Sequence, residues 1–239
     1  MGDRNSKWIN DGEAIQNYFR DRFCSIYKSA NPRIPSSLKE LIQACITKEE
    51  NEDSCRIPVG DEIKKVKWSM NPLKAPGSNG FPRLFYKHYW DEIRGLMILA
   101  VQSFYRYGWI LKELNQTFIT LILKSKGACN FNQFGSISLC KVCYKIIAKI
   151  LVNRLRPLLG LKLEPAQVAF VPSRWIIENV ILAQELIHHF KRTKKKKSHL
   201  VIKLDFIKAY DKVEWSFILA VLKAFSFYEK FVNMIKQCT

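Results

Sequence analysis

The 239-residue sequence predicts a helix-rich α+β fold, and three observations support this class. Apolar residues recur at the spacing of amphipathic helices through much of the chain. A few short runs of β-branched residues are typical of strands. The apolar fraction of 48% is large enough for a packed core in one large domain or two small ones.

The expected helices follow the amphipathic spacing. The first covers residues 12–28, where Ile15, Phe19, Phe23 and Ile26 share a face. Further helices are expected over residues 60–70, 84–107, 141–159 and 175–191 and along a stripe of Trp215, Leu219, Leu222 and Phe225. We expect the helix at 141–159 to stop near Pro157 and Gly160.

Three strands are expected between these helices, over residues 116–124, 137–139 and 200–206. The segment 71–82, "NPLKAPGSNGFP", must be a loop because it holds three prolines and two glycines.

A polar, proline-containing and acidic stretch precedes the basic part of the chain and predicts a domain boundary there. We therefore divide the sequence into residues 1–57, a connector with one amphipathic helix, and residues 58–239, the main domain.

Charge is unevenly distributed along the chain. The formal net charge is +18, and residues 59–239 hold 30 Lys+Arg against 12 Asp+Glu, which is the entire excess. Such a basic surface favours a polyanionic partner, with nucleic acid ahead of acidic lipid. A membrane-surface protein stays an alternative, although no amphipathic segment singles it out, and we expect no membrane partner. No secretory signal or transmembrane run is visible, so we expect an intracellular location, the nucleus included.

The seven cysteines favour reduced thiols, because their number is odd and they are scattered through the chain. Cys140 and Cys143 form one C-x-x-C, which we interpret as a helix face rather than a zinc site, since no second pair accompanies it. The adjacent His188 and His189 point to different faces of a helix and do not easily share a metal.

Asp205 follows an apolar run, Val201 to Leu204, that is typical of a buried strand. A carboxylate there is a good ligand for Mg²⁺, and the carbonyl oxygen of Phe206 can add a second donor. Phosphoryl-transfer enzymes use two such metal ions. The spacing alone favours a simpler interpretation, in which Asp205 caps a turn and Asp211 caps the next helix.

Basic residues at helical spacing are candidates for contacts with nucleic acid phosphates, and a soluble outer face is the competing interpretation. These candidates are Lys74, Lys141, Lys145, Lys149, Arg154 and Arg156. The basic run at residues 191–197 is better explained as a solvated loop, with a contact to a template backbone as the alternative.

Five blocks of the sequence resemble the reverse transcriptase of plant LINE-type non-LTR retrotransposons, in the same order and near the same spacing. They are "LKAPGSNGFPRLFYKHYW", "FITLILKSK", "FGSISLCKVCYKIIAKILVNRL", "PAQVAFVPSRWIIENVILAQEL" and "VIKLDFIKAYDKVEW". The resemblance covers about residues 58–239, and "NYFRDRF" is similar to the connector that follows the endonuclease in such elements.

The resemblance implies a partial right-hand polymerase, with the fingers and the beginning of the palm but without the thumb. The implied function is RNA-directed DNA polymerase activity on an RNA template and a DNA primer, with deoxynucleoside triphosphates and Mg²⁺ in a complete enzyme. The alternative is a non-catalytic remnant that only binds nucleic acid. In either case we expect an affinity that falls steeply with salt.

The resemblance also assigns roles to single residues. Asp205 matches the first catalytic, metal-binding aspartate, and Phe206 the residue whose carbonyl supports it. Tyr210 matches the aromatic residue beneath the incoming sugar, Lys124 a lysine near the triphosphate, and Gln167, Phe170 and Arg174 a block along the template and the nucleotide pocket. For Phe170, core packing is an equally good explanation.

Five positions in three of the blocks depart from the family pattern, and one motif is missing from the sequence. Gly135 stands where the family has an arginine that grips the triphosphate, and Ser136 where it has proline. Ser173 stands where the family has glycine, and Ser78 and Asn79 where proline and aspartate are usual. Loss of a charge-assisted contact to phosphate should weaken nucleotide binding by about 1.5–3 kcal/mol. The A-D-D hairpin with the other metal-binding carboxylates does not occur in these residues, so we expect the chain alone to be truncated and inactive.

Overall fold

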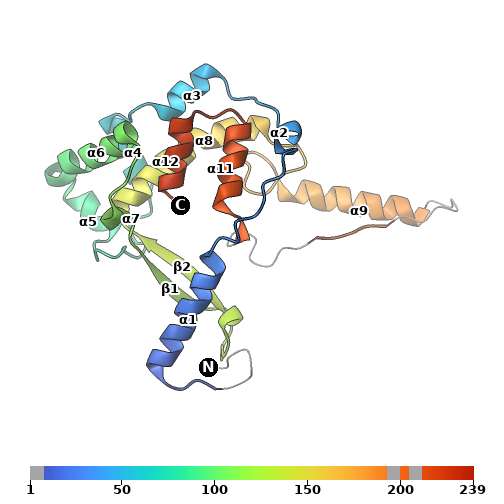
Figure 1. The fold of residues 1–239 in the computed structure, drawn as a ribbon, viewed down its shortest axis with the longest axis horizontal. Helices are drawn as coiled ribbons and strands as arrows, with labels where there is room; N and C mark the ends of the chain where they lie inside the picture. The colour runs from blue at the N-terminus through green and yellow to red at the C-terminus, as the bar shows by residue number, and fades with distance from the viewer. Residues whose placement is uncertain (1–7, 193–199, 205–211) are drawn as a thin grey trace.

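The computed structural model describes residues 8–192, 200–204 and 212–239. Figure 1 shows helices grouped around a long central helix, a two-stranded hairpin below them, and one helix that projects sideways. The elements are α1 (Gly12–Tyr27), α2 (Leu38–Leu41), α3 (Lys48–Cys55), α4 (Gly60–Trp68), α5 (Arg83–His88), α6 (Trp90–Tyr107), α7 (Lys112–Asn115), β1 (Thr117–Leu123), η1 (Phe131–Gln133), β2 (Phe134–Cys140), α8 (Val142–Lys162), α9 (Ile176–Arg192), α11 (Trp215–Ala224) and α12 (Glu229–Gln237). The predicted helix-rich class is confirmed.

Helix α8 forms the centre of the hydrophobic core. Its residues Ile146, Ile147 and Ile150 are fully buried, and α3, α4, α6 and α7 all contact it. The C-terminal helix α12 packs against α3 and α11 and brings Phe231 and Met234 into the same core. The core therefore joins segments from both ends of the chain.

Two helix boundaries differ from the prediction. Helix α8 continues through Pro157 to Lys162, because Leu155 and Leu158 pack against the core on both sides of the proline and hold it in the helix. The helix expected over residues 84–107 is divided into α5 and α6 at Tyr89, whose ψ of 32° is not helical. The break lets Trp90 turn inward, where it is buried edge-on against Trp68 of α4, with ring centroids 5.2 Å apart.

The hairpin is formed by β1 and β2, which pair antiparallel from Thr117 opposite Cys140 to Leu123 opposite Phe134. The returning strand expected at residues 137–139 is thus longer than predicted, at Phe134–Cys140. Helix α1 lies beside this hairpin in Figure 1, and its aromatic side chains make the contact. The ring of Phe19 lies 5.2 Å from that of Phe134, and the ring of Phe23 lies 5.1 Å from that of Phe131.

The segment before residue 58 contributes to the core as well as covering the hairpin. Ile46 and Cys55 are buried there. Helix α3 begins with a capping box, in which Thr47 accepts from the backbone N–H of Glu50 and the Glu50 carboxylate accepts from that of Thr47. The domain boundary at residue 57 stays a prediction.

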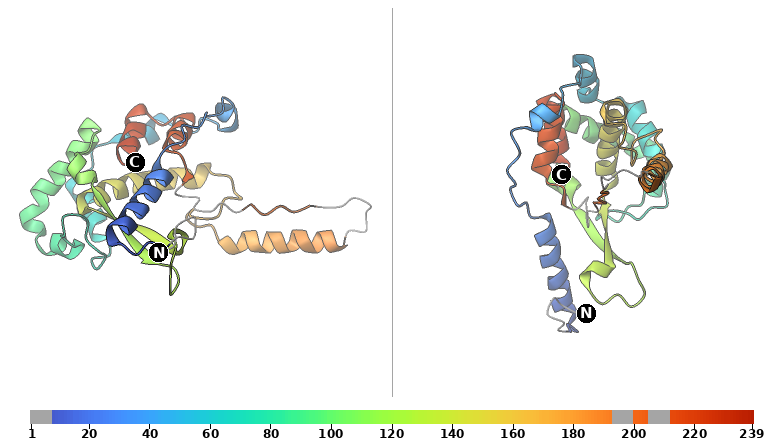
Figure 2. Two further views of the ribbon diagram at one scale, coloured as in Figure 1. Left: turned by 60° about the horizontal axis from the view of Figure 1, so that its bottom comes forward. Right: turned by 90° about the vertical axis from the view of Figure 1, so that its right-hand side faces the viewer.

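Helix α9 and residues 200–204 form a projecting arm, with the segment running back alongside the helix in both views (Figures 1 and 2). None of the α9 residues is buried. Residues 200–204 were expected to form a strand, but they are not in one, and residues 205–206 lie outside the described ranges. A strand needs a partner for its backbone N–H and C=O groups, and the only sheet in the described part of the chain is the β1–β2 hairpin.

Candidate nucleic-acid interface

Four cationic side chains surround one open depression of about 510 Å³ between α8 and the loop that precedes α5. They are Lys74, Arg83, Lys145 and Lys149. No carboxylate belongs to the lining that the structure describes. The depression therefore has the charge of an anion-binding site, and it unites three of the predicted nucleic-acid residues with Arg83.

The geometry of α8 explains why two of these lysines point the same way. Lys145 and Lys149 are four residues apart, so they project from one side of the helix. The intervening Ile146 and Ile147 turn to the opposite side and are fully buried. Burial of one face thus fixes the direction in which the two cations point.

The loop that carries Lys74 is held against the start of α8 by a close backbone contact. A Cβ atom at Gly77 would lie only 2.6 Å from the carbonyl group of Cys140 and from the backbone nitrogen of Lys141. Only glycine fits at this distance without displacing the backbone. Arg83 adds a second tie, because its Nη1 donates to the carbonyl oxygen of Asn71 at 3.1 Å.

The pKa values of two cations in the depression, Lys145 and Arg83, are lowered. Burial lowers the pKa of Lys145, and the nearby positive charges of Arg83 and Lys74 lower it further. Burial also lowers the pKa of Arg83. A bound phosphate group would relieve this repulsion, because an opposite charge favours the protonated form of each cation.

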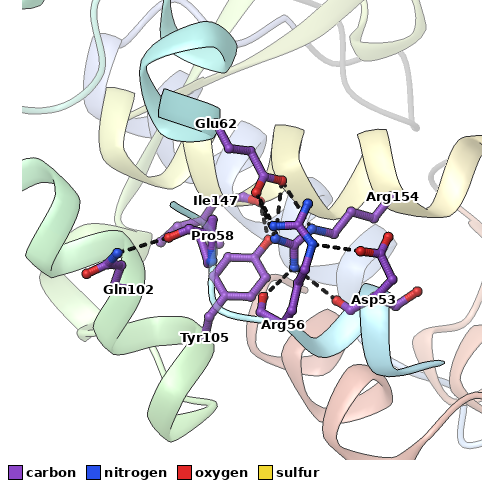
Figure 3. Close-up of polar contacts among 9 residues, drawn as sticks. Asp53, Arg56, Pro58, Glu62, Gln102, Tyr105, Ile147 and Arg154 are labelled. Carbon is purple, nitrogen blue, oxygen red and sulfur yellow. Dashed lines mark hydrogen bonds and ion pairs between the residues drawn. The ribbon is translucent and has the colours of Figure 1, made fainter. Parts of the chain in front are cut away.

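Arg154 was predicted to contact phosphates, and the structure corrects this assignment. Its side chain is 4% exposed and forms an ion pair with Glu62 at 3.1 Å. It also donates to the carbonyl oxygens of Ser54 and Arg56, and its guanidinium lies over the ring of Tyr105 (Figure 3). Helical spacing alone could not separate Arg154 from its exposed neighbours, because the carboxylate that pairs with it lies in α4.

The remaining predicted phosphate contacts lie elsewhere. The ammonium group of Lys141 donates to the carbonyl oxygen of Glu113. Arg156 is exposed beside a separate, mainly apolar hollow of about 200 Å³. The structure does not bring these two residues into the basic depression.

Arg174, predicted to bind nucleotide, is engaged within the chain. Its Nη1 donates to the carbonyl oxygens of Glu164 and Gln167, and its Nη2 to those of Gly160 and Leu163. All four terminal N–H groups are therefore used to hold the turn after α8. The Gln167 amide donates to the carbonyl oxygen of Ala169, and Phe170 is 85% exposed, so core packing does not explain it.

Lys124 lies at the end of β1, and its backbone N–H donates to the carbonyl oxygen of Gln133 at 2.9 Å. A Cβ built at Gly135 would lie 3.6 Å from the Cε of Lys124, which is ordinary van der Waals contact. Gly135 therefore lies next to Lys124, the lysine predicted to contact the triphosphate.

Residues 124–239 match a protein-family model. The matching model is that of the reverse transcriptase (RNA-dependent DNA polymerase) family. The match includes Lys124 at its first residue and all of α8, α9, α11 and α12.

The chain is also similar to part of a longer protein. The chain is 28% identical over 233 residues to the protein named "Transposon TX1 uncharacterized 149 kDa protein" of Xenopus laevis. The alignment covers 95% of this chain and 17% of the relative, so the chain spans about a sixth of that protein's length. This relative gives no support to a specifically plant origin.

The residues predicted to bind metal and nucleotide after the apolar run at 201–204 belong to one segment of the sequence. Asp205, Phe206, Tyr210 and Asp211 lie outside the described residues, and their roles stay predictions. In the described ranges, no group of three or more metal-ligating side chains is found, and no helix is long and apolar enough to cross a bilayer.

Two features were missed by sequence reasoning. Arg83 was not singled out, although it follows the proline-rich loop and is close in sequence to Lys74. Ser173 was noted only as a departure from glycine, and the structure supplies the physical reason for that glycine, since Ser173 has a φ of 64°. Cys140 and Cys143 were expected on one helix face, but Cys140 is the last residue of β2 and Cys143 alone lies in α8. Burial raises the pKa of the Cys143 thiol to about 11.

Proposed function

We propose that this chain is part of the RNA-directed DNA polymerase of a non-LTR retrotransposon and provides the fingers and the beginning of the palm. The family match over residues 124–239 carries the proposal. The transposon relative supports the element class, because its alignment extends over nearly the whole chain.

The basic depression at Lys74, Arg83, Lys145 and Lys149 holds the backbone of the nucleic acid in this proposal. Phosphate groups replace the missing counter-charge between these side chains, and counterions are released when they bind. The contact is independent of sequence, since point charges on phosphate carry no information about the bases.

Asp205 and the carbonyl of Phe206 provide the first metal-binding donors in the proposed reaction, and Lys124 contacts the triphosphate. A bound Mg²⁺ supplies charge neutralisation at the reacting phosphate.

Primer extension tests the catalytic part of the proposal. The measurement is Mg²⁺-dependent incorporation of deoxynucleotides onto a DNA primer annealed to an RNA template, by the protein that carries this chain, because these residues alone are expected to be inactive. Incorporation that is lost in Asp205→Ala and retained in Asp211→Ala supports the polymerase. Binding of template and primer without incorporation by the protein carrying this chain supports the second candidate, a non-catalytic nucleic-acid-binding protein, which the basic depression alone can explain.

A salt titration tests the proposed interface. Affinity for RNA should fall steeply with salt, and Lys145→Gln or Lys149→Gln should each reduce the slope of log K against log salt by about 1. Lys112→Gln is the matched control, because Lys112 is an exposed helical lysine outside the depression. Equal effects of all three substitutions would show that the net charge of the chain, rather than this depression, binds the RNA.

A further inference from the structure

A second pocket, of about 470 Å³, lies between the end of α1 and the start of α11. Its lining includes Tyr27 and Lys28 from the first segment and Lys212 and Trp215 from the second. These segments are more than 180 residues apart in the sequence, and Figure 1 shows the upper end of α1 next to the start of α11.

Glu214 joins the two sides of the pocket. One carboxylate oxygen accepts from the Ser29 hydroxyl at 2.7 Å, and the other accepts from the backbone N–H of Ala30 at 2.9 Å. These hydrogen bonds, the Ala30 bond first, lower the pKa of Glu214, so the carboxylate stays ionised and both bonds persist at neutral pH.

Two aromatic rings in the pocket lining are accessible. Tyr27 is 46% exposed and Trp215 is 49% exposed. The ring of Tyr27 is held by Phe23, which stacks on it with a centroid distance of 6.1 Å and an interplanar angle of 13°. Exposed aromatic rings beside lysines are the combination with which proteins bind single strands, because bases stack on the rings and phosphates pair with the cations.

Net charge favours an anionic occupant. Lys28 and Lys212 contribute two positive charges to the lining, and Glu214 contributes one negative charge that is already shared between two protein donors. The volume lies in the range of about 300–1,000 Å³ that is usual for ligand pockets.

We propose that this pocket binds one unit of a single-stranded nucleic acid, with its base stacked on Tyr27 or Trp215 and its phosphate against Lys28 and Lys212. The proposal rests on the nucleic-acid binding proposed above and adds a second contact, which is formed only when the N-terminal connector is bound to the segment after Asp211. Glu214 is a positioning residue in it.

Fluorescence polarisation of a labelled oligouridylate, with the whole chain as the binding protein, tests the stacking. Tyr27→Ala or Trp215→Ala should weaken binding by about fivefold to a hundredfold, and Trp215→Phe should retain most of the affinity because a ring is kept. Trp109→Ala is the matched control, since Trp109 is 54% exposed and lies outside the pocket. An abasic oligonucleotide of the same length should bind the parent and the variants with equal affinity, because it has no base to stack on the rings.

Glu214→Ala separates positioning from simple electrostatics. The substitution removes a negative charge, so electrostatics alone predicts tighter binding. The proposed pocket predicts weaker binding, because Ser29 and Ala30 lose their shared acceptor, and Glu214→Gln should give an intermediate affinity. Thermal unfolding of each variant checks that the fold is retained.

The outcomes distinguish the two proposals. Parent-like affinity of Tyr27→Ala and Trp215→Ala, equal effects of base-containing and abasic strands, or tighter binding by Glu214→Ala would overturn the pocket. Loss of affinity in the Lys145 and Lys149 variants alone would leave the basic depression standing without the pocket. Loss of affinity in Tyr27→Ala and Trp215→Ala alone would support the pocket and leave the basic depression unsupported.

Discussion

Helices α8 and α9 have similar sequence patterns and opposite environments. Both are long, amphipathic and basic near their C-terminal ends. Helix α8 is enclosed by four other helices and buries Ile146, Ile147 and Ile150, whereas no residue of α9 is buried. An apolar stripe therefore defines which face a helix can bury, and a complementary surface elsewhere in the fold decides whether that face is buried.

The strongest test of this comparison is at Arg154, the buried cation of α8. Arg154→Ala removes a buried guanidinium and leaves the carbonyl oxygens of Ser54 and Arg56 without its N–H groups, while Glu62 keeps its ion pair with Arg56 at 2.7 Å. The substitution should lower the free energy of unfolding by about 3–5 kcal/mol. Arg156→Ala, on the exposed side of the same helix, should change it by less than about 0.5 kcal/mol. Chemical denaturation of both variants measures the difference, and a small loss in Arg154→Ala would contradict the buried ion pair.

Isoleucine truncation compares the two helices directly. Ile147→Ala in α8 should destabilise the chain by about 2–5 kcal/mol, because Ile147 is fully buried. Ile181→Ala in α9 should have an effect below about 0.5 kcal/mol, since Ile181 is 48% exposed. The same denaturation experiment serves here, and a comparable loss at both positions would show that α9 is covered in solution.

Lys67 of α4 is a buried cation whose titration should make the stability of the fold depend on pH. Burial, with the charge of Lys87 as a smaller cause, lowers the pKa of Lys67 from 10.5 to about 8. Its Nζ has no hydrogen-bond partner among the described residues and lies 3.5 Å from the ring centroid of Trp68.

The direction of the stability change with pH follows from the number of protons that Lys67 binds in the folded and unfolded chain. Between pH 8 and 10.5 the unfolded chain binds more protons at this residue than the folded chain, so its contribution to stability rises with pH across that window. Below pH 8 the full penalty is present. Lys67→Met should therefore be more stable than the parent at neutral pH, with an advantage that shrinks by on the order of 1 kcal/mol as pH rises.

Thermal unfolding of parent and Lys67→Met across this pH range measures the difference. Lys65→Met is the control, because Lys65 is exposed on the same helix. A constant difference between Lys67→Met and the parent would rule out titration of Lys67 in the folded state.

The smallest expected effect concerns the turn before α9. Ser173 adopts a φ of 64°, in the left-handed region, which is unfavourable for every residue that has a Cβ atom. Ser173→Gly should raise the free energy of unfolding by about 0.5–1 kcal/mol. Ser78→Gly, at a position without a positive φ, should lower it instead. Differential scanning calorimetry compares the pair, and stabilisation by both substitutions would refute the strain at Ser173.

Much of the secondary structure follows from local pattern. The helix predicted for residues 12–28 is α1 at Gly12–Tyr27, and the strand predicted for residues 116–124 is β1 at Thr117–Leu123. The helix depends on contacts between residues three and four apart, which periodicity records. The strand β1 pairs with β2, the next strand in the sequence. The strand predicted from residue 200 does not form over residues 200–204, because a strand depends on a distant partner that periodicity does not show.

The candidate site was only partly predictable for the same reason. Lys145 and Lys149 were identified from their helical spacing, which sets their common direction. Arg154 fits the same spacing, but Glu62, ninety-two positions away, draws it into the core.

The sequence by itself determined the class of this protein: its basic charge, its amphipathic helices and the ordered blocks that resemble a reverse transcriptase. The tertiary structure alone decided which cations face solvent, which carbonyl groups Arg174 holds, and that Tyr27 and Trp215 line one pocket. Composition and local order are properties of neighbouring residues, whereas burial and charge pairing depend on which distant segments meet when the chain folds.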